Sequence, residues 1–147
     1  MLVLGVTSPL KVGVYIDGRL AESFKSEEKT SKALPPILHD LRYRYDLAGL
    51  YYARGPGSFM AIKVTYVMLE TFAIALNLPL RAADAFAFNG GAPIKAVGRS
   101  CFVKRGGEIV VETGCDTERK PHFKLPQRLD EVAWDEENQP LYVLPAV

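Results

Sequence analysis

The sequence has few of the residues that enzymes most often use for metal binding and nucleophilic catalysis. Its 147 residues include two histidines, two cysteines and one tryptophan. His39 and His122 lie far apart, and no H-E-x-x-H or H-x-x-x-H pair occurs. A G-x-S-x-G nucleophile elbow is also missing. We therefore expect neither a catalytic residue nor a metal site in this chain.

The two cysteines and the N-terminal residues both favour a reducing compartment. Cys101 and Cys115 belong to no C-x-x-C motif, and two cysteines in a chain of this size are weak support for a disulfide framework. We expect them to be unreactive thiols. The N-terminal residues lack the basic region and the cleavage site of a signal peptide. These patterns predict a cytoplasmic protein.

The charge balance gives no overall attraction to nucleic acid. Apolar residues make up 48% of the chain and charged residues 24%, and the net charge is +1. These values are ordinary for a globular protein with a buried core. One local exception is the stretch from Lys95 to Arg128, which carries eight basic residues against four acidic ones. A solvated face is the simpler interpretation, and direct contact with RNA phosphates stays an alternative.

The segment from Met60 to Leu78 is the most apolar part of the chain. Fourteen of its nineteen residues are apolar, interrupted by Lys63 and Glu70, among others. A charge near the middle of a membrane span is costly, so we predict a helix that packs in a globular protein and no membrane contact. Its apolar residues lie nearly all round the helix, which favours burial on more than one side. Because so small a domain has little protein to cover such a helix, the first helix or a second protein must do so.

The first half of the chain predicts strands and helices in a clear order. An Asp17-Gly18 turn joins two alternating segments, and a short apolar run precedes them, so three antiparallel strands open the protein. A first helix follows, with apolar residues three and four positions apart. It is followed by a strand at 48–53, a glycine-rich turn at 54–58 and the long helix.

The second half predicts shorter elements. We expect a strand at 80–82, a helical turn at 84–88, two strands at 94–104 and 108–113, and an irregular, acidic tail. The alternation indicates an α/β protein with a mixed sheet, in the order of one lobe of the actin-like, sugar-kinase-like ATPase fold. We expect a first lobe at 1–90 and a reduced second lobe at 91–147.

The glycine-rich turn allows two interpretations. It lies between a strand and a helix, where backbone N–H groups can hold an anion, and its residues are Gly55, Pro56, Gly57, Ser58 and Phe59. It is neither a P-loop nor a G-x-G-x-x-G motif. The simpler interpretation is structural, with glycine providing a tight turn and Ser58 capping the helix. We do not expect phosphoryl transfer, because the first strand ends in Leu4-Gly5-Val6-Thr7-Ser8 without a carboxylate to position a metal.

The block RGPGSFMAIK at Arg54–Lys63, followed by a long apolar helix and the run LPLRAADAFAF, resembles the TsaB (YeaZ) family of tRNA threonylcarbamoyladenosine biosynthesis proteins. That family carries G-P-G-S-F-T-G-[LV]-R-[IV]-G here, so 55–59 match, whereas Met60, Ala61 and Lys63 depart from the pattern. Val6 stands where the family has the Asp of I-D-T. The resemblance extends over residues 1 to about 112.

The resemblance implies a non-catalytic scaffold with no cofactor of its own. Family members bind the ATPase TsaD, which holds ATP and metal, through their first two helices. TsaE joins the complex, which modifies tRNA, and the same helices form homodimers. On this chain the resemblance and the apolar pattern together predict an interface made of Leu34, Ile37, Leu38, Leu41, Met60, Lys63, Val64, Val67, Met68 and Thr71. The alternative is a small phosphotransferase or hydrolase of the same fold that uses Ser58 and Lys63 around a phosphate.

Overall fold

The computed structural model describes residues 1–96, 98–115 and 122–143. Its main element is a five-stranded mixed sheet in the order β3-β2-β1-β4-β5. The strands of this sheet are β1 (Leu2–Leu4), β2 (Leu10–Ile16), β3 (Arg19–Ser26), β4 (Leu50–Ala53) and β5 (Leu80–Ala83). The first three strands are antiparallel and β1, β4 and β5 are parallel, so the predicted α/β class and the predicted meander are both confirmed.

The β2–β3 turn forms where the sequence predicts it. Asp17 and Gly18 both adopt positive φ angles, 53° and 78°, which match the twist of the flanking strands. Asp tolerates this conformation because its short polar side chain can bond locally, and glycine because it lacks Cβ.

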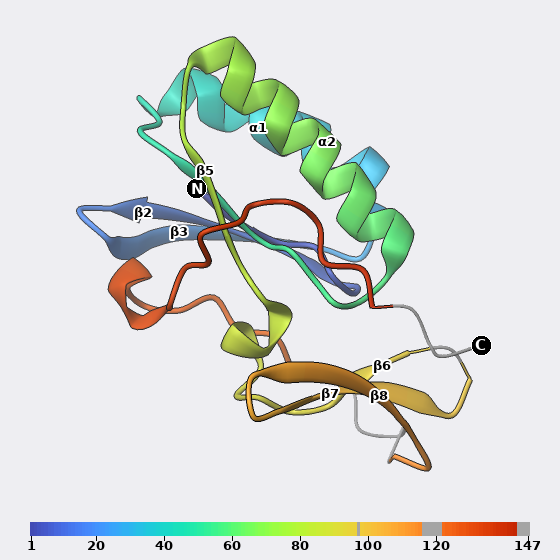
Figure 1. Cartoon of the computed structure of the whole chain (residues 1–147). Coiled ribbons are helices and arrows are strands. Elements are labelled where there is room, and N and C mark those ends of the chain that lie inside the picture. The colour runs from blue at the N-terminus through green and yellow to red at the C-terminus, as the bar shows by residue number, and fades with distance from the viewer. Residues whose placement is uncertain (97, 116–121, 144–147) are drawn as a thin grey trace.

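Two helices pack side by side over one face of the sheet (Figure 1). They are α1 (Thr30–Arg44) and α2 (Phe59–Leu76). The helix α2 ends at Asn77, whose left-handed conformation closes the last turn with N–H bonds to the carbonyls of Ala73 and Ile74. The helix therefore begins one residue before the predicted start and ends two residues before the predicted end.

Both faces of the sheet are buried, and successive residues of β1 divide between them. Val3 packs into the core under the helices, with Leu34, Leu41 and Leu69. Leu2 and Leu4 point to the opposite face and join a second core. The first core is the one that α1 and α2 close. The second core is closed by elements from the C-terminal half of the chain.

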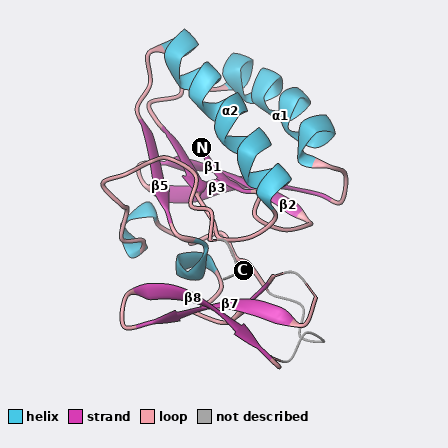
Figure 2. Ribbon diagram, turned by 45° about the vertical axis from the view of Figure 1, so that its right-hand side comes forward, coloured by secondary structure: helices cyan, strands magenta, loops and turns pink. Residues whose placement is uncertain are grey.

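Part of this second cover is a separate three-stranded sheet, β6 (Ile94–Lys95), β7 (Ser100–Arg105) and β8 (Glu108–Thr113), visible below the main sheet in Figure 2. The predicted single strand at 94–104 is wrong, because it contains two antiparallel strands, with Gly98 at positive φ between them. The predicted helical turn is present as the 3-10 helix η1 (Ala85–Phe88).

The expectation that the cysteines are unpaired thiols is also wrong. Cys101 in β7 and Cys115 beyond β8 form a disulfide, with their Cα atoms 6.4 Å apart. Gly114, at a φ of 77°, turns the chain after β8 so that Cys115 returns over β7. The pair closes the open end of the β7–β8 hairpin.

The rest of the second cover is the C-terminal segment 122–143, called the strap here. At one edge of the main sheet Leu20 donates its N–H to Gln127, and at the other edge Asp135 donates its N–H to Ala82. Figure 1 shows this segment, coloured orange to red, crossing the sheet between its two edge strands. Phe123, Val132 and Trp134 fill the core on that face. Most of the acidic tail thus packs on the first sheet, and the division into lobes at residue 90 stays a prediction.

Candidate functional site

The GPGSF turn connects β4 to α2 and is buried except at its end. Gly57 lies against the chain that follows β1, since a Cβ on this residue would meet the Val6 carbonyl oxygen at 2.6 Å. Ser58 donates its backbone N–H to the same oxygen at 2.9 Å, and Ala85 donates its N–H to Gly55 at 2.8 Å. The turn therefore fixes the starts of α2 and η1 against the end of β1.

These contacts explain both glycines physically. Gly55 has a φ of 121°, which L side chains rarely adopt, and a Cβ there would meet the Leu141 carbonyl oxygen of the strap at 2.5 Å. Ser58 is the N-cap residue of α2, but its side chain makes no capping hydrogen bond, so the predicted role of its hydroxyl is wrong. Because Gly55–Gly57 are buried, only Ser58 and Phe59 of this turn face solvent.

Arg54, the residue before the turn, binds the turn to the strap. Its Nε donates to the Gln139 carbonyl oxygen at 2.7 Å, and its two Nη atoms reach the carboxylates of Asp135 and Glu137 at 3.3 and 3.4 Å. Tyr52, two residues earlier, donates its hydroxyl to the Asn138 carbonyl oxygen. Burial raises the pKa of this hydroxyl, which keeps it protonated as a donor. Two clustered acids of the tail thus have a structural role that the sequence did not reveal.

The exposed face of α2 is the most unusual surface in the described part of the chain. Met60, Val67 and Ile74 are 69%, 52% and 74% exposed, although all three are apolar. With Lys63 and Thr71 they recur every three or four residues and form one exposed row, called the α2 stripe. The opposite row, Ile62, Thr65, Leu69 and Ala73, is buried. The chain therefore covers one face of α2 and leaves an apolar face open.

The predicted interface residues of α1 lie elsewhere. Leu34, Leu38 and Leu41 are buried in the chain's own core, so they are unavailable to a partner, and this part of the predicted interface is corrected. Ile37 is half-buried against the same core. An apolar helical row predicts burial but cannot say whether the sheet or a partner buries it. The exposed aromatic side chain on α1 is Tyr43, which stacks on His39 with ring centroids 4.9 Å apart.

Four of the six predicted α2 residues lie on one exposed row of the helix. Met60, Lys63, Val67 and Thr71 lie on the α2 stripe, and Val64 is half-buried beside it. Met68 packs partly against the helix-side core. Lys63 points to solvent on the same row as Val67 and so does not face the buried turn at Gly55–Gly57.

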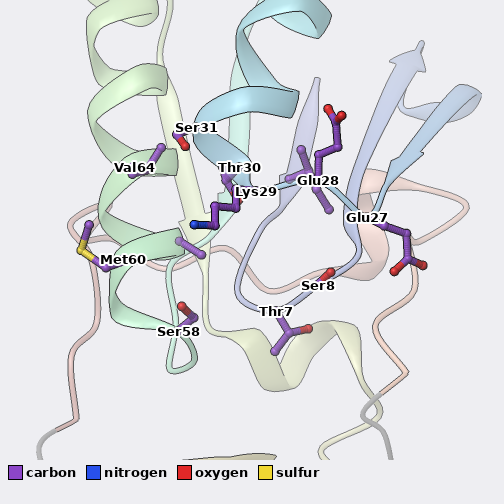
Figure 3. A pocket seen from close by; sticks show the side chains of 12 residues that line it. Thr7, Ser8, Glu27, Glu28, Lys29, Thr30, Ser31, Ser58, Met60 and Val64 are labelled. Carbon is purple, nitrogen blue, oxygen red and sulfur yellow. The ribbon is translucent and has the colours of Figure 1, made fainter.

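A pocket of about 480 Å³ opens where α1 and α2 begin (Figure 3). Leu10, Ala61 and Val64 provide its apolar part. The polar lining residues are Thr7, Ser8, Glu27, Glu28, Lys29, Thr30, Ser31 and Ser58. Met60 lines the pocket and also begins the α2 stripe, so the two features are continuous.

The carboxyl ends of the parallel strands carry little chemistry. Val6 follows β1, the buried turn follows β4, and Asp84 follows β5. One oxygen of Asp84 accepts from Lys104 of the small sheet. Within residues 1–96, 98–115 and 122–143, no group of three or more His, Cys, Asp or Glu side chains could hold a metal ion.

The helix α2 also meets the length and composition of a membrane span. Its mean hydropathy is 1.6 over 18 residues, and 22% of that window is buried. The same helix packs against α1, β4 and β5. Its low burial is a second measure of how much apolar surface α2 leaves open.

Comparison with known proteins identifies the fold. No protein-family model and no curated protein sequence matches the chain. Among solved structures, YeaZ from Pseudomonas aeruginosa superposes with a TM-score of 0.59 at 19% identity, covering 77% of this chain and 63% of YeaZ. The chain has the actin-like fold of YeaZ. A second structure, an uncharacterized protein with similarity to peptidase YeaZ from Pseudomonas aeruginosa, gives a TM-score of 0.57 at 20% identity, covering 77% of this chain and 62% of its own.

The YeaZ fold agrees with the predicted fold class, and it supports the resemblance carried by the GPGSF block. The chain spans less than two thirds of the length of these two structures.

Proposed function

We propose that this protein is a TsaB-like, non-catalytic scaffold subunit of the complex that makes N6-threonylcarbamoyladenosine in tRNA. In this proposal it docks on a TsaD-like ATPase through the outer surface of its helix pair. ATP and metal are bound by that partner, a TsaE-like ATPase joins the complex, and tRNA is engaged by the assembly. The complex works in the cytoplasm, and in isolation the chain pairs with a second copy.

The observation that carries the proposal is the α2 stripe. Three large apolar side chains on one helical row are 52–74% exposed, next to a fully buried row of the same helix. Exposed apolar surface of this kind marks contact sites in soluble proteins, because burying it against a partner is favourable. The YeaZ fold and the GPGSF block supply the kind of partner.

The residues at the carboxyl ends of the parallel strands give separate support. Within residues 1–96, 98–115 and 122–143, the carboxylate that follows a parallel strand is Asp84, one oxygen of which accepts from Lys104, and the GPGSF turn is filled by its own backbone contacts. Phosphoryl transfer needs positioned positive charge and a metal-binding carboxylate. A supporting role in a complex fits these residues better than an enzymatic one.

The proposal is tested by measuring association with the TsaD-like protein of the same organism. Val67→Asp places a charge in the α2 stripe, and we expect the dissociation constant to rise at least about tenfold. Ile16→Asp is the matched control, since Ile16 is also 52% exposed but lies at the end of β2, away from the helices. Circular dichroism and thermal melting check that both variants fold.

Three outcomes of this experiment decide whether the chain docks through α2. Loss of binding with Val67→Asp and not with Ile16→Asp supports docking through α2. Equal binding by both variants contradicts it, and so does the absence of any complex with the unchanged protein. Sedimentation of the isolated chain measures the proposed self-association separately.

A further inference from the structure

The pocket at the start of α1 and α2 is continuous with the α2 stripe. Met60 belongs to both, and Val64 lines the pocket beside the stripe. A partner that covers the stripe must therefore also cover the mouth of this pocket. An interface with an open pocket inside it loses contacts on both sides, so such pockets commonly receive an anchoring side chain.

The deeper part of the pocket is apolar. Leu10, Ala61 and Val64 form this part, and Leu10 is buried in the helix-side core. Met60 stands at the edge, and its flexible side chain can adapt to the shape of a bound group. Thr7, Ser8 and Ser58 also line the pocket and bring hydroxyl groups to it (Figure 3). This arrangement favours an apolar group inside with polar neighbours at the mouth.

The charge at the mouth is uneven. Figure 3 shows the Lys29 ammonium directed toward α2, whereas the carboxylates of Glu27 and Glu28 point away from that helix. Glu28 pairs with Lys32, at 3.7 Å. Lys29 makes no ion pair with any described residue. The side of the pocket that adjoins the α2 stripe therefore presents a positive charge next to apolar surface.

We propose that this pocket is the socket for one apolar side chain of the docked protein, flanked on that protein by a carboxylate that pairs with Lys29. The inference rests on the proposed function, because the same docked partner covers the α2 stripe. It adds where the partner is anchored and which two kinds of side chain it brings. Complementary charge at the mouth speeds association and fixes orientation, and the buried apolar group slows dissociation.

Two pairs of variants test the socket by titration calorimetry with the TsaD-like protein. Lys29→Glu reverses the charge at the mouth, and Lys25→Glu is its control at an exposed position of β3, outside the pocket lining. Ala61→Trp fills the pocket, and Ala21→Trp is its control at an exposed position of β3. We expect both socket variants to weaken binding about tenfold or more and both controls to stay within about twofold. Melting curves exclude unfolding.

The outcomes separate this inference from the proposed function. If Val67→Asp abolishes binding but both socket variants bind like the unchanged protein, the socket is wrong and the docking surface stands. If Val67→Asp also has no effect, both are wrong. If the socket variants weaken self-association in sedimentation and leave the TsaD-like partner bound, a second copy occupies the socket and the proposal is overturned.

Discussion

Leu141 donates its backbone N–H to the carbonyl oxygen of Arg54 across 2.7 Å. This bond joins the strap to the residue that precedes the GPGSF turn, and the Arg54 side chain adds three contacts to the same strap. The turn that starts α2 is therefore fixed on one side by the residues that follow β1 and on the other by the strap. The orientation of the α2 stripe depends on both.

Loss of the Arg54 side chain is expected to loosen the strap. Arg54→Ala leaves the Gln139 carbonyl oxygen without its donor and removes two ionic contacts from a buried group, so we expect the free energy of unfolding to fall by about 1–3 kcal/mol. Urea denaturation measures this change. Arg128→Ala is the control, because Arg128 makes a solvent-exposed ion pair with Asp130 and its removal should change stability little. Equal effects would contradict the role of Arg54.

The close contact of Gly57 predicts a cost for any side chain there. Gly57→Ala would bring Cβ to 2.6 Å from the Val6 carbonyl oxygen, so the turn or β1 must move, at a cost of about 1–3 kcal/mol. At Gly49 the nearest atoms to a new Cβ are 3.6 Å away, an ordinary contact. We expect Gly49→Ala to melt close to the unchanged protein and Gly57→Ala to melt several degrees lower.

A pH effect is expected from Glu22. Hydrogen bonds from Arg44 and Tyr45 hold the pKa of the Glu22 carboxyl below its ordinary value of 4.5. Because the pKa is lower in the folded state, the stabilisation is present above pH 4.5 and is lost as the pH falls through the folded pKa. We expect Glu22→Gln to flatten the fall in melting temperature between pH 6 and pH 3, modestly because the pair is exposed. An equally steep fall in Glu22→Gln and in the unchanged protein would contradict this role of Glu22.

Nucleotide binding distinguishes the scaffold from the enzymatic alternative. Val6 occupies the position after β1, and the strap lies against Gly55, so we expect no micromolar affinity of the isolated protein for Mg-ATP. Calorimetric titration tests this. Micromolar affinity that disappears with Ser58→Ala would favour the phosphotransferase or hydrolase.

Direct tRNA binding by the stretch from Lys95 to Arg128 is expected to be weak. Lys104, Arg105 and Arg128 each pair with a carboxylate, which removes part of the positive charge. Arg119 and Lys120 lie outside the described residues. We expect binding of tRNA by the chain alone to vary little with salt. A steep loss of affinity between 50 and 200 mM salt, on the order of a thousandfold, would instead support a phosphate-binding surface.

The sequence predicted the elements whose signals are local. The Asp17-Gly18 turn, the two long helices and the glycine-rich turn depend on neighbouring residues, and the structure has all of them. The strap could not be predicted, because its contacts join residues far apart in the chain. Tyr52 and Asn138, for example, meet across 86 positions. Nothing in the acidic tail alone indicates that Asp135 and Glu137 pair with a buried arginine.

The predicted interface residues also show what local sequence patterns cannot reveal. Leu34 and Val67 are both apolar residues of predicted helices, and the apolar pattern together with the family resemblance assigned both to a partner. The structure buries Leu34 in the chain's own core and leaves Val67 exposed, because the sheet covers one row of each helix. The disulfide escaped prediction for a related reason, since the turn at Gly114 and not the spacing of the cysteines brings them together.

The strap has a consequence for how the protein is made. The Tyr15 hydroxyl donates to the Pro126 carbonyl oxygen, 111 positions later, and Lys11 reaches the carbonyl oxygen of Phe123. During translation, the face of β1 that carries Leu2 and Leu4 therefore lacks the strap until residues 123–134 have left the ribosome. Native contacts between such distant residues slow folding, so nascent chains of this protein should depend on chaperones until the strap has been made.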